Sequence, residues 1–509
     1  MRKLDCLLMT LMLLSFTTLF AERGDIVEAI PLSYYDIETL EEMVGTLLPS
    51  ELSALANSAL PINHEVDLYR MVYETINPHG EVCVASGLVA LPVNPVCKAA
   101  MLCYEHGTMV KRGDAPSFAF LNNEAQALIP VFCAADGYVG LAPDYLGLGV
   151  DDTQIHPYIH AKSEATATVD LIRAAKIFCA QTVPLNGQLF ICGYSQGGHA
   201  AMATHREIQE LHKGELHVTA SAPMAGPYDA SGVQSAALTS NQPYPSPDYA
   251  PYVAFAYQYV YGNLFDDPSE VFKAPFDEIL PPLFDGTHSL GEVANALYDN
   301  GLTIPKDMFL PEVVAEFESG EHALFDNLRD NDLYNWVPET PMRMFYCEAD
   351  EHVVFENAIV AHDNFMAAGA NPGCVEHASS GAIFDHGDCA PIAIITGKVY
   401  FDAMRDEVAC DDYQEPQYCS FVGIDNAIAT SLAMRVFPNP SEGLTLIQFD
   451  NPNQVSYQLA VHDLNGKVVK SANNITGNQY QLNCSDLASG MYMLTLNGER
   501  VFHGRIVVN

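Results

Sequence analysis

One serine of the sequence lies in a setting where its hydroxyl group could act as a nucleophile. Ser195 is the central residue of Gly193-Tyr-Ser-Gln-Gly-Gly198, a G-x-S-x-G pattern that follows the apolar run Gln188–Cys192 and precedes a helical segment. Small residues in this strand-turn-helix order permit a sharp turn that presents the serine hydroxyl at a helix N-terminus. Because a serine hydroxyl is a weak nucleophile alone, a base and an oxyanion site are also required.

The other members of a catalytic triad are predicted from chain order. After a serine in this kind of turn, the acid follows a later strand and the histidine comes last. Asp350 follows the apolar run Met342–Cys347 and is the predicted acid, with Glu348 as the less well placed alternative. His386 lies in a predicted loop before the last helix and is the predicted base. It would take the proton from Ser195 and later give it to the leaving group.

Two backbone N–H groups are needed to stabilise the negative charge that develops on a substrate oxygen. We expect one from Gln196, directly after the serine, and one from the loop that follows the predicted strand Ala99–Tyr104. In that loop Gly107 permits close backbone approach, and the N–H of Thr108 is the predicted second donor. His106 is expected to form hydrogen bonds within the same loop rather than to act as an acid or base.

Other polar residues near these motifs are interpreted as structural. Asp144 precedes Ser195, which is the wrong chain order for the catalytic acid. His199 lies on the predicted helix after the serine and is expected to be packed. Asp385 and Asp388 flank the predicted base and are expected to cap or tune it locally.

The elements that position these groups alternate between strands and helices. Two predicted strands, Val66–Ile76 and Val82–Leu91, flank a turn signature at Asn77-Pro-His-Gly80 and favour an antiparallel pair. Beyond them, buried strands alternate with helices, which predicts a parallel sheet with right-handed crossovers. We assign the core to residues 65–227 and 342–405.

The remaining segments differ from this core in composition and in the pattern of their apolar residues. Residues 1–21 carry Arg2-Lys3 before an apolar run and predict a secretory signal peptide. Residues 22–64 predict an N-terminal helical arm, and residues 228–341 form an aromatic- and proline-rich insertion expected to cover the site as a lid. Residues 406–431 are interpreted as a linker. Residues 432–509 show short alternating strands and predict a small β-sandwich.

The charge composition limits the classes of partner that the protein is expected to bind. The 509-residue chain has a formal net charge of −41, and basic and acidic residues balance after residue 431. The negative charge therefore lies in the preceding residues, where it repels nucleic acid and anionic membranes. We expect a secreted or cell-surface protein with no nucleic-acid partner, no metal or cofactor, and no transmembrane segment in the mature chain.

The number of cysteines is compatible with an exported protein that forms disulfides. The chain has 13 of them, and loss of the one in the signal peptide leaves an even number, which permits disulfides. Spacing leaves the pairing open, and Cys374 with Cys389 and Cys410 with Cys419 are plausible bridges. A bridge to Cys389 would hold the segment that carries His386. Cysteines inside apolar strand-like runs are expected to be buried thiols, and these are Cys103, Cys192 and Cys347.

In combination, these motifs resemble the secretory lipase family of α/β hydrolases, of the fungal lipase A type. The matching residues are Tyr104-Glu-His-Gly-Thr108, Pro143-Asp-Tyr-Leu-Gly-Leu-Gly149, Gly193–Gly198, Asp350 and His386. The resemblance covers residues 65–405. It implies the α/β-hydrolase fold, a helical lid between the nucleophile and the acid, and hydrolysis of carboxylic esters of varied acyl length.

The C-terminal residues carry a second resemblance. Three motifs, Val436-Phe-Pro-Asn-Pro-Ser441, Asp463-Leu-Asn-Gly-Lys-Val468 and Leu487-Ala-Ser-Gly-Met-Tyr492, are similar to those of type IX secretion sorting domains of Bacteroidetes. This resemblance implies export across the outer membrane by the type IX machinery, removal of the tail, and release or surface attachment. It also implies that residues 432–509 take no part in catalysis.

The leading hypothesis is an exported serine esterase or lipase that cleaves an ester or lipid substrate through an acyl-enzyme on Ser195. A serine peptidase of the same fold is an alternative, disfavoured because the sequence has no added propeller-like β-domain. A surface-displayed binding protein with a degenerate hydrolase fold is another. It is disfavoured because the triad order and both oxyanion elements are intact. We expect the insertion to set the preference for acyl chain length.

Overall fold

The computed structural model describes residues 23–47, 59–120, 125–405 and 432–508, the last range with short gaps at 434, 438–440, 442, 450, 452–453, 463–466, 489 and 499–500. The chain divides into two compact units, one up to residue 419 and one from residue 420. The expected signal peptide, the expected linker and the Cys410–Cys419 pair lie outside the described residues.

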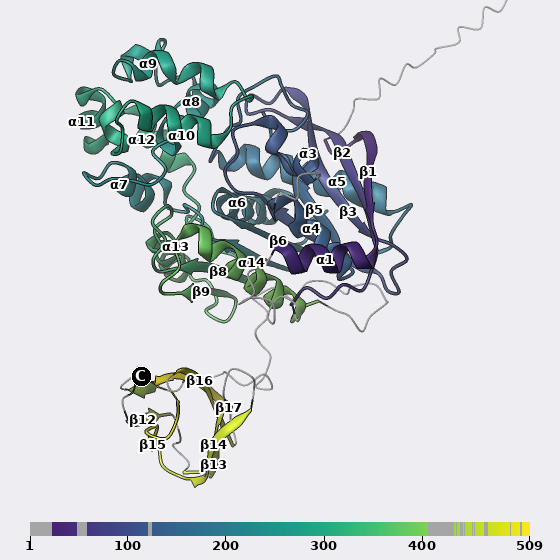
Figure 1. Cartoon of the computed structure of the whole chain (residues 1–509), viewed down its shortest axis with the longest axis vertical. Coiled ribbons are helices and arrows are strands. Elements are labelled where there is room, and N and C mark those ends of the chain that lie inside the picture. The colour runs from purple at the N-terminus through teal and green to yellow at the C-terminus, as the bar shows by residue number, and fades with distance from the viewer. Residues whose placement is uncertain are drawn as a thin grey trace, which may run out of the picture. The chain divides into compact units, whose positions relative to one another are not determined.

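A nine-stranded sheet organises the described part of the first unit, in the order β1-β2-β3-β5-β4-β6-β7-β8-β9 (Figure 1). Three strands at one edge pair in antiparallel fashion: β1 (Ile26–Tyr35), β2 (Val66–Ile76) and β3 (Val82–Pro92). The other strands run parallel to one another: β4 (Ala99–Glu105), β5 (Val139–Pro143), β6 (Leu185–Tyr194), β7 (Ala220–Met224), β8 (Met342–Cys347) and β9 (Val375–Gly381). The predicted antiparallel opening pair and parallel sheet are therefore confirmed.

Helices cover both faces of the sheet, and strand β4 shows how the sequence specifies this. Its residues alternate between faces, as strand geometry requires. Met101 and Cys103 share a core with α5 (Ala161–Cys179) and α6 (Gln196–Leu211), whereas Leu102 and Tyr104 pack with α4 and α14. Because both faces are covered, β4 is buried along its whole length, which explains its unbroken apolar run. The remaining helices around the sheet are α1 (Ile37–Leu47), α3 (Pro116–Ala119), α4 (Ala125–Ala135), α13 (Glu356–Ala367) and α14 (His386–Asp402).

The expected N-terminal helical arm is helical in part only. Within its described residues, α1 is the main helix, while Ile26–Tyr35 form the edge strand β1, which pairs with β2. The pairing is interrupted by two irregularities, and both Val27 and Tyr34 are largely exposed. An irregular edge strand with exposed apolar residues lacks the clean alternation from which a strand is predicted.

The insertion between β7 and β8 is helical in its described residues. It contains α7 (Ser235–Leu238), α8 (Tyr249–Tyr261), α9 (Phe276–Ile279), α10 (Leu290–Asp299), α11 (Pro311–Ser319) and α12 (Ala323–Asp330). Its own core is rich in aromatic side chains, among them Tyr252, Tyr257 and Phe272. Figure 1 shows these helices gathered beside the sheet, in the upper left of the view. The aromatic composition of residues 228–341 thus reflects a helical layer whose core also includes Val110, Tyr158 and Ile159.

The second unit contains two antiparallel-rich sheets around one core. The larger sheet joins β10 (Leu432–Ala433), β17 (Val501–Val508), β16 (Gly490–Asn497), β13 (Tyr457–His462) and β14 (Val468–Ile475). The smaller sheet joins β11 (Arg435–Phe437), β12 (Leu444–Gln448) and β15 (Gln479–Asn483). Side chains from both sheets share the core, for example Ile447 and Leu494. This arrangement confirms the predicted small all-β unit.

No helix in the described ranges is both long enough and apolar enough to span a lipid bilayer.

Candidate active site

Ser195 lies in a strained turn between β6 and α6. Its backbone adopts φ 61° and ψ −123°, a left-handed region that non-glycine residues rarely occupy. The neighbours must be glycine, because a Cβ atom at Gly193 would lie 2.2 Å from the Gly197 carbonyl oxygen, and one at Gly197 would lie 1.9 Å from the Glu105 carbonyl oxygen. The G-x-S-x-G pattern therefore encodes the close packing of this turn against the end of β4.

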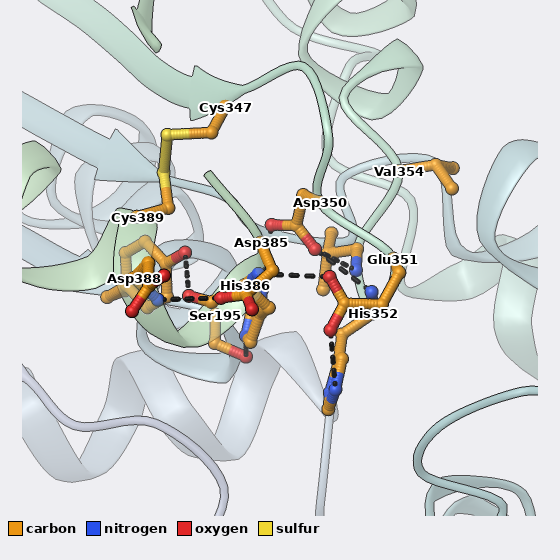
Figure 2. Close-up of polar contacts among 12 residues, drawn as sticks. Ser195, Cys347, Asp350, Glu351, His352, Val354, Asp385, His386, Asp388 and Cys389 are labelled. Carbon is orange, nitrogen blue, oxygen red and sulfur yellow. Dashed lines mark hydrogen bonds and ion pairs between the residues drawn. A yellow bond between two sulfur atoms is a disulfide. The ribbon is translucent and has the colours of Figure 1, made fainter. Parts of the chain in front are cut away.

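The structure brings the three predicted triad residues together (Figure 2). Ser195 Oγ lies 2.9 Å from His386 Nε2, and His386 Nδ1 lies 2.7 Å from Asp350 Oδ2. The three residues are 7%, 9% and 5% exposed, respectively. The alternative acid, Glu348, is exposed and takes no part in this chain of hydrogen bonds.

Asp350 is held so that it fixes the protonation pattern of His386. Its Oδ1 accepts hydrogen bonds from the backbone N–H groups of His352 (3.0 Å) and Val353 (2.8 Å), which leaves Oδ2 facing His386. An ionised carboxylate only accepts hydrogen bonds, so Nδ1 of His386 carries the proton. Nε2 then presents its lone pair to Ser195, as general-base chemistry requires.

His386 lies on a helix, and the expectation that it would lie in a loop was wrong. It is the first residue of α14, and Asp385 is the N-cap, whose side chain accepts a hydrogen bond from the N–H of Asp388 (2.8 Å). The backbone N–H of His386 donates to Glu351 Oε2 (3.1 Å). Sequence patterns locate a helix start only to within a few residues, which explains the difference.

A disulfide joins the acid-bearing and base-bearing segments, but not the predicted one. Cys389 pairs with Cys347, and Cys374, its predicted partner, is bonded in another disulfide. Cys347 was expected to be a buried thiol because it ends an apolar strand, whereas Cys103 and Cys192 are buried free thiols as expected. Sequence spacing does not reveal that the end of β8 faces the first turn of α14. Figure 2 shows the bond beside the triad residues.

The two residues predicted as oxyanion donors each line a cavity that Ser195 also lines. Gln196 is the first residue of α6, and N–H groups in the first turn of a helix have no acceptor within the helix. A Cβ atom at Gly107 would lie 3.7 Å from Ser195 Cβ, and Thr108 lines the same cavity as Ser195 and His386. The N–H of Gly107 is already bonded to the side chain of Gln126. Thr108 is therefore the better candidate for the second donor.

His106 and Asp144 have the structural environments that the sequence predicted. His106 is fully buried, its Nδ1 lies 2.7 Å from the Gly107 carbonyl oxygen, and burial lowers its pKa to about 4. Its ring is therefore neutral and holds the loop. Asp144 is also fully buried and accepts hydrogen bonds from Ser86 Oγ and from the N–H and Oγ of Ser117. It ties β3, β5 and α3 together.

Two buried carboxyl groups lie next to the nucleophile turn, and sequence reasoning missed one of them, that of Glu164. Burial raises the pKa of Glu105 to about 8, and hydroxyl groups of neighbouring residues donate hydrogen bonds to it. Glu164 accepts hydrogen bonds from the side chain of Gln196 (2.9 Å) and lies 2.7 Å from His199 Nδ1. His199 is packed, as expected. The Gln196 contact ties the residue after Ser195 to a fixed buried carboxyl group.

His352 is another residue that sequence reasoning missed. Its ring stacks on that of His386, with 4.9 Å between centroids and an angle of 5° between planes. Its Nδ1 lies 3.2 Å from both Ser246 Oγ and Tyr249 OH, which belong to the insertion. Burial and the neighbouring His386 lower the pKa of His352. Its carbonyl oxygen accepts hydrogen bonds from two further side chains of the insertion, those of Gln234 and Tyr244.

Two cavities meet at Ser195. The larger has a volume of about 560 Å³ and extends between α4 and α14, with His386 in its wall. The smaller, of about 100 Å³, extends into the insertion and is lined mainly by apolar residues, with Gln196 near Ser195. Tyr249 borders both. Within the described part of the chain, no group of three His, Cys, Asp or Glu residues is placed to hold a metal ion.

Both units of the chain resemble known proteins. Residues 435–509 match the family model of the secretion system C-terminal sorting domain, which implies export to the cell surface or the medium by type IX machinery. A search of curated proteins gives no match.

Solved structures resemble the first unit. A presumed hydrolase from Legionella pneumophila is 26% identical, with a TM-score of 0.67, over 75% of this chain and 99% of that one. The rice cell wall degrading esterase LipA from Xanthomonas oryzae is 29% identical, with a TM-score of 0.65, over 76% and 98%. Lipase A of Candida antarctica shares the fold at 16% identity, with a TM-score of 0.54, over 78% and 86%. The first unit therefore has the hydrolase fold found in lipases and esterases.

Proposed function

We propose that this protein is an exported serine hydrolase that cleaves carboxylic esters through an acyl-enzyme formed on Ser195. The observation that carries the proposal is the hydrogen-bonded chain from Ser195 Oγ through His386 to Asp350, at a strained turn that faces two cavities. The likeness to the esterase LipA, at 29% identity, supports ester chemistry.

In the proposed mechanism, His386 Nε2 takes the proton of Ser195 as Oγ attacks the ester carbonyl carbon. The negative charge that develops on the carbonyl oxygen is stabilised by the N–H groups of Gln196 and Thr108, each worth on the order of 3 kcal/mol of the barrier. His386 then gives its proton to the departing alcohol oxygen, and Asp350 stabilises the imidazolium. Water attacks the acyl-enzyme by the same route, with His386 again as the base.

The route of export is also part of the proposal. The sorting tail implies a protein that leaves the cell or stays on its surface. We assign residues 1–21 to the signal peptide for the first membrane and infer that the tail is removed after the second. The β-rich second unit has its own core and no residue of the candidate site.

The test compares hydrolysis of p-nitrophenyl esters from acetate to palmitate with that of a peptide p-nitroanilide. Ser195→Ala should abolish ester turnover while leaving the thermal unfolding midpoint unchanged, and Ser319→Ala, at an exposed serine, is the matched control. Ester hydrolysis that survives in Ser195→Ala would refute the assignment. Cleavage of the anilide alone would favour the serine peptidase, and inactivity on all substrates would favour the binding protein.

A further inference from the structure

The two cavities differ in which reacting groups they contain. His386 and Thr108 line only the larger cavity, whereas Gln196 lines only the smaller, and Ser195 lines both. An ester bound at Ser195 has two arms, the acyl chain and the alkoxy group, and two cavities are present to receive them.

The chemistry of acyl transfer decides which arm enters which cavity. When the tetrahedral intermediate collapses, the bond from the carbonyl carbon to the alkoxy oxygen breaks, and that oxygen receives the proton held on His386 Nε2. The alkoxy oxygen must therefore lie within hydrogen-bond distance of Nε2, which is on the side of the larger cavity. The acyl chain then extends away from His386, into the smaller cavity within the insertion.

We propose that the larger cavity is the alcohol-binding site and that the natural alcohol is bulky and apolar. This inference rests on the proposed function. The inference follows from the volumes of the two cavities, about 560 Å³ for the larger cavity and about 100 Å³ for the smaller cavity on the acyl side. Methanol or glycerol would leave most of the cavity unfilled, and only a large apolar group would replace water along its walls.

The walls of the larger cavity support an apolar occupant. They are formed mainly by aliphatic and aromatic side chains of α4, α14, β4 and β6, such as Ile129, Phe132 and Ile394. Burial keeps the thiol of Cys133 neutral by raising its pKa to about 12. The cationic group of Lys398 is already paired, since its Nζ lies 2.6 Å from Asp136 Oδ2 and 2.7 Å from Asp402 Oδ2. Among the described residues that line this cavity, no unpaired charged side chain is therefore left to recognise an anionic or strongly polar alcohol.

The experiment holds the acyl group constant and changes the alcohol. Hydrolysis of ethyl, cyclohexyl and menthyl butanoate is measured for the wild-type protein, and kcat/KM should rise at least tenfold from the ethyl to the menthyl ester. Ile394→Trp, which fills the larger cavity, should reduce or reverse this preference, and Ala390→Leu should do so to a smaller extent if the tryptophan variant does not fold.

A matched variant tests the other cavity. Val253→Trp, in the wall of the smaller cavity, should lower the ratio of decanoate to butanoate hydrolysis and keep the preference for the menthyl alcohol. The inference is overturned if the wild-type protein prefers the ethyl ester, or if Val253→Trp rather than Ile394→Trp removes the alcohol preference. Failure of the proposed function is a different result, because no ester of the series would then be cleaved in a manner that depends on Ser195.

Discussion

Replacing Asp350 with asparagine would change one group of the candidate triad, because an amide NH₂ group replaces one carboxylate oxygen. The carboxylate Oδ1 accepts two backbone hydrogen bonds, from His352 and Val353, while Oδ2 faces His386 Nδ1. In Asp350→Asn the amide oxygen must take the Oδ1 position to keep the two backbone bonds. The amide NH₂ then faces Nδ1 of His386 as a donor. Nδ1 must become the acceptor, so the proton moves to Nε2.

That tautomer is unable to accept the proton of Ser195. We expect kcat to fall by about 10⁴, as an asparagine in place of the triad aspartate does in other serine hydrolases, which corresponds to about 5 kcal/mol in the activation barrier. The fold should be unaffected because the amide oxygen still caps the two backbone N–H groups.

The assay is the steady-state hydrolysis of p-nitrophenyl butanoate, with the thermal unfolding midpoint as a check on folding. Glu348→Gln is the matched control, since this neighbouring carboxylate is exposed, and it should change kcat by less than twofold. A loss below tenfold in Asp350→Asn would show that another group sets the His386 tautomer. An equal loss in both variants would attribute the effect to general charge rather than to the hydrogen bond.

Two further predictions concern stability. Removing the disulfide in Cys347→Ala/Cys389→Ala should lower the free energy of unfolding by about 4 kcal/mol, from the chain entropy of a loop with a sequence separation of 42, and an unchanged urea midpoint would contradict this. Glu105, whose pKa rises from 4.5 to about 8 on folding, contributes stability that is complete below pH 4.5 and is lost as the pH rises through about 8. Urea unfolding between pH 4.5 and 9 should therefore show a weaker pH dependence for Glu105→Gln than for the wild type, and equal slopes would refute the role of this carboxyl group.

Local patterns in the sequence were sufficient to predict the fold and to choose the residues around Ser195. Glycine is required at positions 193 and 197 because a Cβ atom there would lie too close to neighbouring backbone atoms. The strand and the helix on either side of the turn are predicted from the residues that form them. The order of Ser195, Asp350 and His386 follows from sheet topology, which alternation of strands and helices predicts. These features depend on short-range sequence.

Some features that depend on which distant segments meet were not predicted. The partner of Cys389 is set by the approach of β8 to α14, and the strand β1 is defined by its pairing with β2. His352 follows directly after Asp350 and Glu351, yet its importance lies in contacts with Ser246 and Tyr249 of the insertion. No periodicity carries that information. A histidine beside the predicted acid was the only available signal.

The contacts of His352 link movement of the insertion to the population of an aligned base. Four side chains of the insertion are hydrogen-bonded to this residue, and its ring lies against that of His386. A conformation in which the insertion moves away would remove these bonds and leave the His386 ring with less support. Any occupant that binds the docked insertion more tightly than the displaced one raises the fraction of molecules with an ordered His386. If the acyl chain occupies the smaller cavity as proposed, a longer chain contacts more of the docked insertion and would raise the fraction of bound enzyme in which His386 is aligned.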